Sequence, residues 1–375
     1  MLKAINIKNF KCFKQLELEN IKDFNIISGK NNSGKTSVLD AIYAFYGVKK
    51  PTTLAELTIF KKESTPFDDN ACFWSSYFND LDESNGFEFL FSINNYKIKQ
   101  TYTSKNENKE NSIISVDIDK SQPLGGITQI STEGTTAKKS LDIKVTAITG
   151  RENKQQIDIT ITPDHIDGNV KASIRNYKRN QVDFLSTIVF ISTSKNVNKG
   201  SLIDSVSTLI KTKRKEELIK YIQIIDNRIK DIAVFKKEKT ESILVDIGLP
   251  EMTDITMLGE GVGRLLIFIS HCLRLENSII LIDEIENGIH YSILKELVVT
   301  LISINKKNKN QLFTTTHSKD LLDSVNSIIS DSPDDMGELI SYTRIDREDE
   351  KKITTANEYD NEEFTYSLEN NWEIR

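Results

Sequence analysis

The chain has 375 residues, which is enough for one large domain or two ordinary ones with a sizeable core. Its 38% hydrophobic and 28% charged residues are typical of a soluble globular protein. A formal net charge of −6 excludes a general attraction to nucleic acid or to anionic membranes, although a local basic patch could still bind DNA.

The cysteines and the apolar runs narrow the class of protein further. Cys12, Cys72 and Cys272 stand far apart without a C-x-x-C pair, so they indicate neither a disulfide framework nor a zinc site. No apolar run approaches the length of a membrane span, and the N-terminus lacks the pattern of a signal peptide. We therefore expect a cytoplasmic protein that does not contact a membrane.

The first elements are predicted to be strands. Ala4–Ile7 and Leu16–Leu18 alternate apolar and polar residues on either side of a predicted turn at Lys8–Phe10, which indicates an antiparallel pair. Phe24–Ile27 then forms a short apolar run that predicts a buried third strand.

A phosphate-binding loop follows this third strand. Gly29–Thr36 fits the pattern G-x-x-x-x-G-K-[ST] without a mismatch, and a helical apolar pattern continues to Gly47. Strand, loop and helix together place backbone N–H groups and a helix N-terminus around a triphosphate. We expect Lys35 to reach the β- and γ-phosphates and Thr36 to ligate Mg²⁺, so ATP and Mg²⁺ are the predicted cofactors. The other predicted nucleotide contacts in this loop are Gly29, Lys30, Asn31, Asn32, Ser33, Gly34 and Ser37.

The middle of the chain changes its periodicity several times. An aromatic cluster at Phe73, Trp74, Tyr77 and Phe78 is expected to be core rather than a stacking platform. Alternating runs between residues 87 and 163 predict an antiparallel meander. Two amphipathic faces between residues 201 and 230 predict a short helical pair, and Leu258–Arg264 opens an apolar helix that runs through Leu275. The four predicted strands are Phe87–Phe91, Ile113–Ile118, Leu141–Val145 and Ile157–Ile161.

Two later strands end in residues that suit nucleotide hydrolysis. Ser278–Ile282 is apolar and leads into Asp283 and Glu284, and ligands bind at the carboxyl ends of such strands in α/β sheets. Asp283 is placed to hold Mg²⁺, and Glu284 is the candidate base that activates the attacking water. Gln311–His317 repeats the pattern, and His317 is predicted to sense or stabilise the γ-phosphate.

The order of these motifs resembles the ABC-type ATPase head shared by transporters, chromosome-structuring proteins and recombination mediators. Ile282–His290, which reads Ile-Asp-Glu-Ile-Glu-Asn-Gly-Ile-His, is similar to the D-E-P-E-N-G-L-H string of the OLD family (overcoming lysogenization defect). Gly259–Arg264 stands where ABC proteins carry L-S-G-G-Q, and Ile7–Phe13 and Leu368–Arg375 also fit the OLD group. The resemblance implies an α/β fold, an ABC/SMC-type P-loop ATPase head with an antiparallel β subdomain and a short helical insertion.

We expect the chain to divide accordingly into four parts. Residues 1–200 form the N-terminal lobe with the phosphate loop and the β subdomain, and residues 201–245 form the helical insertion. Residues 246–345 form the C-terminal lobe with the signature-like, Asp-Glu and histidine motifs, and residues 346–375 form a charged extension.

The resemblance also implies a mechanism in which two heads sandwich two ATP molecules. Each ATP lies between the loop of one subunit and the glycine-led helix of the other, so Gly259, Glu260, Gly261 and Gly263 are predicted to face the partner's γ-phosphate. Lys11 occupies the position where many relatives place an arginine that touches the nucleotide. Asn287 and His290 are implied to lie in the segment that crosses the dimer interface.

Three features depart from the ABC pattern. The signature serine is missing, because Gly259 and Glu260 stand in its neighbourhood, so recognition of ATP across the dimer is expected to be altered or weak. Ile285 replaces the usual proline after Asp-Glu. The glutamine of the Q-loop is not marked, and Gln155, Gln156 and Gln181 all remain candidates.

The resemblance leaves three functions to compare. OLD proteins continue into a Toprim nuclease domain, whereas only 34 residues follow Ser341 here, so no intrinsic nuclease is expected. The first hypothesis is an ATPase that forms a homodimer or larger oligomer and holds a separate nuclease effector, similar to the ATPase subunits of the PARIS and Septu anti-phage systems. The alternatives are a RecF-like DNA-binding repair ATPase and a protein that binds nucleotide without turnover.

Direct DNA contact would need a local basic cluster. The candidates are Lys171, Arg175, Lys178 and Arg179, and a second group, Lys213, Arg214 and Lys215. A solvated helix face is the simpler interpretation of both groups in an acidic chain. The acidic run Asp346–Glu350 is likewise expected to be a solvated face or loop.

Overall fold

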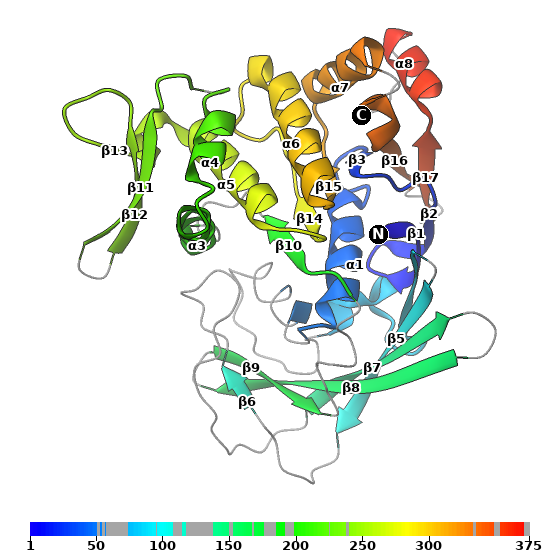
Figure 1. Cartoon of the computed structure of the whole chain (residues 1–375). Helices are drawn as coiled ribbons and strands as arrows, with labels where there is room; N and C mark the ends of the chain where they lie inside the picture. The colour runs from blue at the N-terminus through cyan, green and yellow to red at the C-terminus, as the bar shows by residue number, and fades with distance from the viewer. Residues whose placement is uncertain are drawn as a thin grey trace. The chain divides into compact units, whose positions relative to one another are not determined.

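A computed structural model covers the chain and divides it into two compact units, each assembled from several segments (Figure 1). One consists of Met1–Ile21, Asn31–Ile188 and Ile345–Asn357, and the other of Lys22–Lys30, Val189–Arg344 and Glu358–Arg375. We call them the first and second units. The described residues are 1–50, 53–54, 57, 74–94, 96–107, 115–117, 138–149, 153–166, 169–175, 185–191, 199–224, 226–237, 240–332, 335–348 and 353–370.

The first unit is built on an eight-stranded antiparallel sheet. Its strands, in spatial order, are β2 (Phe13–Leu18), β1 (Leu2–Phe10), β4 (Phe87–Ile93), β5 (Tyr96–Glu107), β7 (Lys138–Thr149), β8 (Asn153–Ile166), β9 (Asn169–Arg175) and β6 (Ser115–Asp117). The predicted antiparallel subdomain is therefore confirmed. Its order is not a simple meander, because β6 pairs with β9 at the edge and β5 lies between β4 and β7.

Aromatic side chains fill the core of this unit, which fixes α1 (Lys35–Gly47) against the sheet. The Phe45 ring of α1 stacks on Phe91 of β4 with 3.9 Å between ring centroids. The side-chain amide of Gln100 in β5 also donates to the Phe45 carbonyl at 3.0 Å. Trp74, Tyr77 and Phe78 are at most 2% exposed, which confirms them as core, whereas Phe73 lies outside the described residues.

The first hairpin turns later than predicted. β1 continues through Phe10, which pairs with Phe13, so the turn lies at Lys11 and Cys12 instead of Lys8–Phe10. Both phenylalanines are fully buried, and their burial favours extending the strands into the aromatic core. Lys11 accordingly takes a positive φ of 51° in the turn.

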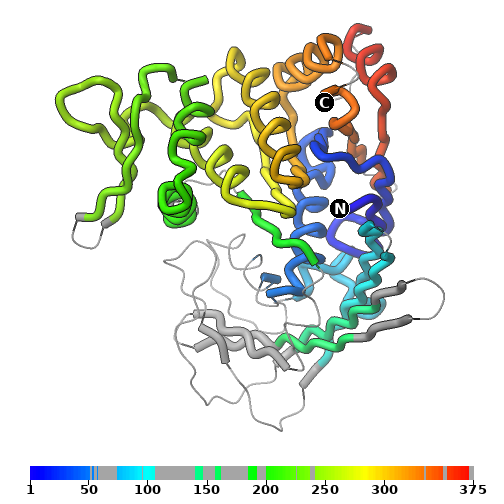
Figure 2. Tube along the Cα trace, viewed as in Figure 1, coloured from blue at the N-terminus to red at the C-terminus, as the bar shows by residue number. Residues whose placement is uncertain are grey.

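Most of the six-stranded sheet that contains the strand before the phosphate loop belongs to the second unit. The strand order of this sheet is β10 (Ile188–Ile191), β14 (Ile279–Ile282), β15 (Gln311–Thr315), β3 (Phe24–Ser28), β16 (Ile340–Glu348) and β17 (Ile353–Tyr359). β16 from Ile345 and β17 as far as Asn357 fall in the first unit. β14, β15, β3 and β16 run parallel to one another. Figure 2 follows the chain by colour and shows that this sheet joins distant parts of the sequence, because β3 lies beside β16.

Helices cover one face of this sheet and complete a single apolar core. Alternate residues of the strands, such as Phe24, Ile280 and Leu312, belong to one buried cluster with the helices. The helices are α3 (Lys199–Lys211), α4 (Lys215–Ile222), α5 (Glu260–Arg274), α6 (Leu294–Asn308), α7 (Lys319–Asp331) and α8 (Asn361–Glu369). A small sheet of β11 (Asp231–Lys237), β12 (Thr240–Asp246) and β13 (Thr253–Asp254) also belongs to this unit (Figure 1).

One prediction about the helical insertion needs correction. The second helix of the insertion ends at Ile222, although the apolar spacing continues to Ile229. Ile229 is fully buried, but it lies beyond a turn in which Asp226 accepts from the Arg228 N–H. The acidic run Asp346–Glu350 begins on β16, which runs to Glu348, and the exposed Glu348 fits the predicted solvated face; Asp349 and Glu350 lie outside the described residues.

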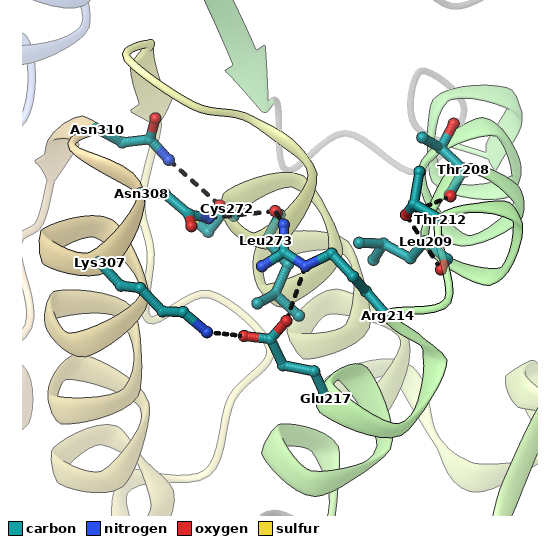
Figure 3. A network of polar contacts seen from close by, with 10 residues as sticks. All are labelled: Thr208, Leu209, Thr212, Arg214, Glu217, Cys272, Leu273, Lys307, Asn308 and Asn310. Atoms are coloured by element: carbon teal, nitrogen blue, oxygen red, sulfur yellow. Dashed lines mark hydrogen bonds and ion pairs between the residues drawn. The ribbon is translucent and has the colours of Figure 1, made fainter.

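Polar side chains close the C-terminal end of α5, the helix that the signature-like glycines open (Figure 3). Asn308 and Asn310 both donate to the Cys272 carbonyl, at 2.9 and 3.2 Å. Arg214 donates to the Leu273 carbonyl at 2.6 Å and pairs with Glu217, which also binds Lys307. Terminal helix carbonyls lack intrahelical partners, so these contacts satisfy them and attach α5 to α6 and to the α3–α4 corner.

None of the helices in the described parts of the chain is long and apolar enough to cross a membrane.

Replacing Asn310 should destabilise the second unit strongly. Its amide donates to the Cys272 and Leu275 carbonyls and its oxygen accepts from the Ser278 N–H, all in a fully buried position. Asn310→Ala should lower the free energy of unfolding by about 2 kcal/mol or more, because buried polar groups lose their partners. Lys307→Ala removes an exposed ion pair of the same network and should change it by less than about 1 kcal/mol. Urea denaturation of both variants tests this, and equal losses would contradict it.

Candidate functional site

The phosphate loop connects the two units, so each unit carries one part of it. β3 brings Gly29 and Lys30 to the sheet edge of the second unit, and Gly29 has a φ of 142°. Asn31 onward belongs to the first unit, where α1 begins at Lys35 and ends at Gly47. The predicted order of strand, loop and helix is confirmed.

The N-terminus of α1 suits a bound triphosphate. Its N-cap Gly34 has a φ of 108°, and a Cβ there would lie 2.7 Å from the Cys12 sulfur, so only glycine fits. No side chain caps this helix and no acid occupies its first turn. The Ser33 hydroxyl is buried and finds no hydrogen-bond partner among the described residues. Phosphate oxygens can accept hydrogen bonds from the N–H groups of an uncapped helix start and from the Ser33 hydroxyl beside it.

Lys11 is engaged within the first unit by an acid and by aromatic rings. Its ammonium lies 2.5 Å from the Asp40 carboxylate on α1 and 5.3 Å from the centroid of the Tyr77 ring. The side chain is 18% exposed, so it still reaches the surface. Its contact with the nucleotide stays a prediction, and the Asp40 pair shows what such a contact would compete with.

Three strand ends meet at one edge of the sheet in the second unit. β14 leads into Asp283, β15 leads toward His317, and β3 leads into Gly29, and these strands are parallel neighbours in the order β14, β15, β3. The carboxyl ends of parallel strands lie at the same edge, which is where ligands bind in such sheets. The structure therefore brings together Asp283, Glu284 and His317 with the start of the phosphate loop.

Thr315, which was not singled out from the sequence, holds the two acids in place. Its hydroxyl donates to the Asp283 carboxylate at 2.5 Å and accepts from the Glu284 N–H at 2.8 Å. The side chain is fully buried at the end of β15. A carboxylate oriented in this way suits Mg²⁺, which prefers oxygen ligands, and Asp283 and Thr36 are the residues expected to hold the ion.

Glu284 combines a half-exposed side chain with a rare backbone conformation. It takes a φ of 52°, a conformation that non-glycine residues adopt rarely and that clusters at functional sites. Its side chain is 42% exposed, and Asn287 donates to its Oε2 at 3.4 Å. The carboxylate is thus accessible to a water molecule, as the base role requires.

His317 lies between two carboxylates. Its Nδ1 is 3.4 Å from Oε1 of Glu286 and 4.0 Å from Oε1 of Glu284. Glu286 also accepts the backbone N–H of His317 at 3.1 Å. Sequence reasoning missed Glu286, although its place in the Asp-Glu-x-Glu string was a signal that could have marked it.

The glycine-led start of α5 is open. Gly259 has a φ of 98°, and a Cβ built at Gly259 or Gly263 would have no described atom within 4 Å. Gly261 approaches the Gly288 carbonyl so closely that a Cβ would lie 3.0 Å from it. Arg264 packs on Gly288 and pairs with Glu260 at 2.8 Å. The signature-like segment and the Asn287–His290 segment therefore contact each other within one chain.

Other predicted residues have different surroundings. His290 is exposed and accepts from the Ser292 N–H at the start of a short helical turn. Ile285 is fully buried, and its N–H donates to the Thr315 carbonyl at 3.4 Å, a bond that the usual proline could not make. Of the Q-loop candidates, Gln155 and Gln156 lie on β8, and Gln181 lies outside the described residues.

Comparison with known proteins identifies the family. Residues 1–322 match the AAA ATPase domain family AAA_15. The chain belongs to this family. It is an ATPase, which favours hydrolysis over nucleotide binding without turnover.

Individual relatives resemble the chain over very different lengths. An ATP/GTP phosphatase of Helicobacter pylori is 24% identical over 348 residues, 88% of each protein. A DNA replication and repair protein RecF of Nitrosococcus oceani is 54% identical over 39 residues, 10% of this chain and 11% of that protein. A solved Smc head domain with an extended coiled coil, bound to a ScpA domain and derived from Pyrococcus furiosus, is 12% identical, covers 98% of each chain and has a TM-score of 0.48.

Lys35→Ala should abolish ATP binding, because the loop loses the charge that neutralises the β- and γ-phosphates. Lys30→Ala is the matched control, since Lys30 is exposed in the same loop and is expected to contribute its backbone. Isothermal titration of ATP should therefore show no binding for the first variant and near wild-type affinity for the second. Retained affinity in Lys35→Ala would remove the loop from its assigned role.

Proposed function

We propose that copies of this ATPase associate around ATP and serve as the sensor and scaffold subunit that controls a separate effector, a nuclease, in bacterial anti-phage defence. The observation that carries the assembly is the open, glycine-led N-terminus of α5. A helix start without a side-chain cap attracts anions, and here the space beside Gly259 and Gly263 is free of described atoms. The γ-phosphate held by a second copy is the anion we expect there.

The contact between Gly261 and Gly288 supports coupling of assembly to hydrolysis. Gly288 follows Asn287, whose amide donates to Glu284, the proposed base. A partner subunit that binds the start of α5 would therefore shift the segment that orients Glu284. Binding between subunits and activation of water would then depend on the same few residues.

Glu260 explains why this association should be weaker than in ABC proteins. Its carboxylate lies in the first turn of α5, where a phosphate would otherwise receive the full positive end of the helix. The ion pair with Arg264 offsets part of this negative charge. We infer that ATP recognition across the dimer is conditional, which suits a sensor that must change state when triggered.

The effector and the biological role rest on the resemblance of Ile282–His290 to OLD-family ATPases. In the anti-phage systems that this chain resembles, the ATPase assembly restrains a toxic nuclease until infection is sensed. A cytoplasmic ATPase with a small nuclease encoded in a neighbouring reading frame is the arrangement we expect.

Glu284→Gln should slow hydrolysis and trap the ATP-bound assembly. The amide cannot accept a proton from water, so kcat should fall by about 100-fold or more while ATP still binds. Phosphate release and light scattering after gel filtration in ATP and Mg²⁺ measure both effects.

Glu296→Gln is the control, because Glu296 is an exposed acid on α6 with the same change of charge. It should hydrolyse ATP at the wild-type rate and should not accumulate a larger species. An unchanged kcat in Glu284→Gln would exclude Glu284 as the base, and a monomer in ATP would contradict the assembly.

The alternative function is a RecF-like DNA repair ATPase, favoured by the short match to RecF. Three contacts within the chain limit its basic candidates. Arg214 donates to Glu217 and to the Leu273 carbonyl, and Lys215 pairs with Asp231 at 2.8 Å. In the other cluster, Lys171 and Arg175 lie on β9, and Lys178 and Arg179 lie outside the described residues.

Electrophoretic shift of duplex DNA distinguishes the two functions. The scaffold proposal predicts that the isolated chain binds DNA weakly, with or without ATP, and loses this binding between about 50 mM and about 200 mM salt. Tight, ATP-dependent binding at the higher salt would favour the repair ATPase. Lys213→Glu should have little effect in the first case.

A further inference from the structure

Glu286 is an acid that the chain buries beside the proposed catalytic residues. Its side chain is 9% exposed, and its Oε2 accepts no hydrogen bond from any described residue. A buried carboxylate oxygen without a partner lowers stability, so its retention needs an explanation. The contacts of the other oxygen, Oε1, supply this explanation, because both of them are made to His317.

The local backbone accounts for this placement. Ile285 turns into the core after β14, and its N–H donates to the Thr315 carbonyl. Glu284 and Glu286 consequently flank a buried residue and both approach the end of β15. The turn is completed by the Asn287 N–H, which donates to the Glu284 carbonyl at 3.0 Å, and by the Ile289 N–H, which donates to the Glu286 carbonyl at 3.0 Å.

The two carboxylates face the same imidazole nitrogen. His317 Nδ1 is 0.6 Å closer to Glu286 than to Glu284, at 3.4 against 4.0 Å. Glu286 is also the more buried acid, at 9% against 42% exposure, so water screens its attraction less. Both differences favour Glu286 over Glu284 as the partner of the Nδ1 side of the ring.

We propose that Glu286 is a positioning residue for ATP hydrolysis that holds His317 through its backbone N–H and its Nδ1. By taking this contact it leaves the Glu284 carboxylate available to the attacking water and leaves the Nε2 of His317 available to the γ-phosphate. The inference rests on the proposed roles of Glu284 and His317. In this proposal Glu286, the second glutamate of the Asp-Glu-x-Glu string, prevents His317 from binding Glu284.

A double-mutant cycle between Glu286 and His317 tests the proposal. Glu286→Gln keeps an oxygen that can accept the His317 N–H but removes the charge that attracts Nδ1. It should lower kcat by about 10-fold to 100-fold, because His317 then turns toward Glu284, while KM for ATP changes by less than about twofold. In a His317→Ala background the same substitution should change kcat by less than about twofold, because the group it positions is absent.

Two further measurements keep the result interpretable. Thermal melting should show that Glu286→Gln and Glu286→Gln/His317→Ala remain folded, and Glu296→Gln should keep the wild-type kcat. Wild-type kcat in Glu286→Gln would overturn the proposal, and so would an equal loss of rate with and without His317. Light scattering of Glu286→Gln in ATP and Mg²⁺ shows whether assembly is retained, so a loss of positioning can be distinguished from a loss of the proposed assembly.

Discussion

The hydrogen bonds of the Thr315 hydroxyl are the interactions that fix the residues after β14. The hydroxyl binds the carboxylate of Asp283 and the backbone N–H of Glu284, and the Thr315 carbonyl accepts the N–H of Ile285. Three consecutive residues after β14 are thus attached to one residue of β15. The parallel register, which pairs Ile282 with Thr314, sets this geometry, so burial of the two strands determines where the acids lie.

The sequence predicted the fold best for elements whose start and end are marked by their own residues. α1 ends at Gly47 and α5 spans Glu260–Arg274 as the apolar spacing and the glycines indicated. Choice of strand partner could not be predicted, because alternation shows which face of a strand is buried but not which strand lies beside it. β6 therefore pairs with β9, far along the chain. Periodicity also wrongly placed Ile229 in the helix, because Ile229 is buried in the same core but lies beyond the helix end.

The residues of the candidate site also differ in whether the sequence alone predicts them. The phosphate loop and the Asp-Glu pair are recognisable because their chemistry requires fixed residue types at fixed spacing. Thr315 and Glu286 are not, since a threonine in an apolar strand and a glutamate in a polar loop are ordinary in sequence. Their importance arises only when β14 and β15 are side by side, which gives Glu286 a contact with His317, 31 residues away.

The conformation of the site is energetically unfavourable for two of its own residues. A positive φ at Glu284 and an unpartnered oxygen at Glu286 each cost about 1–3 kcal/mol. The core beneath can offset this, because β14 and β15 are buried along their whole length and share one apolar cluster with α5, α6 and α7. A stable sheet edge thus fixes two acids with different exposures around one histidine. That difference in exposure, which no single strand encodes, is what allows one acid to face water and the other to hold the ring.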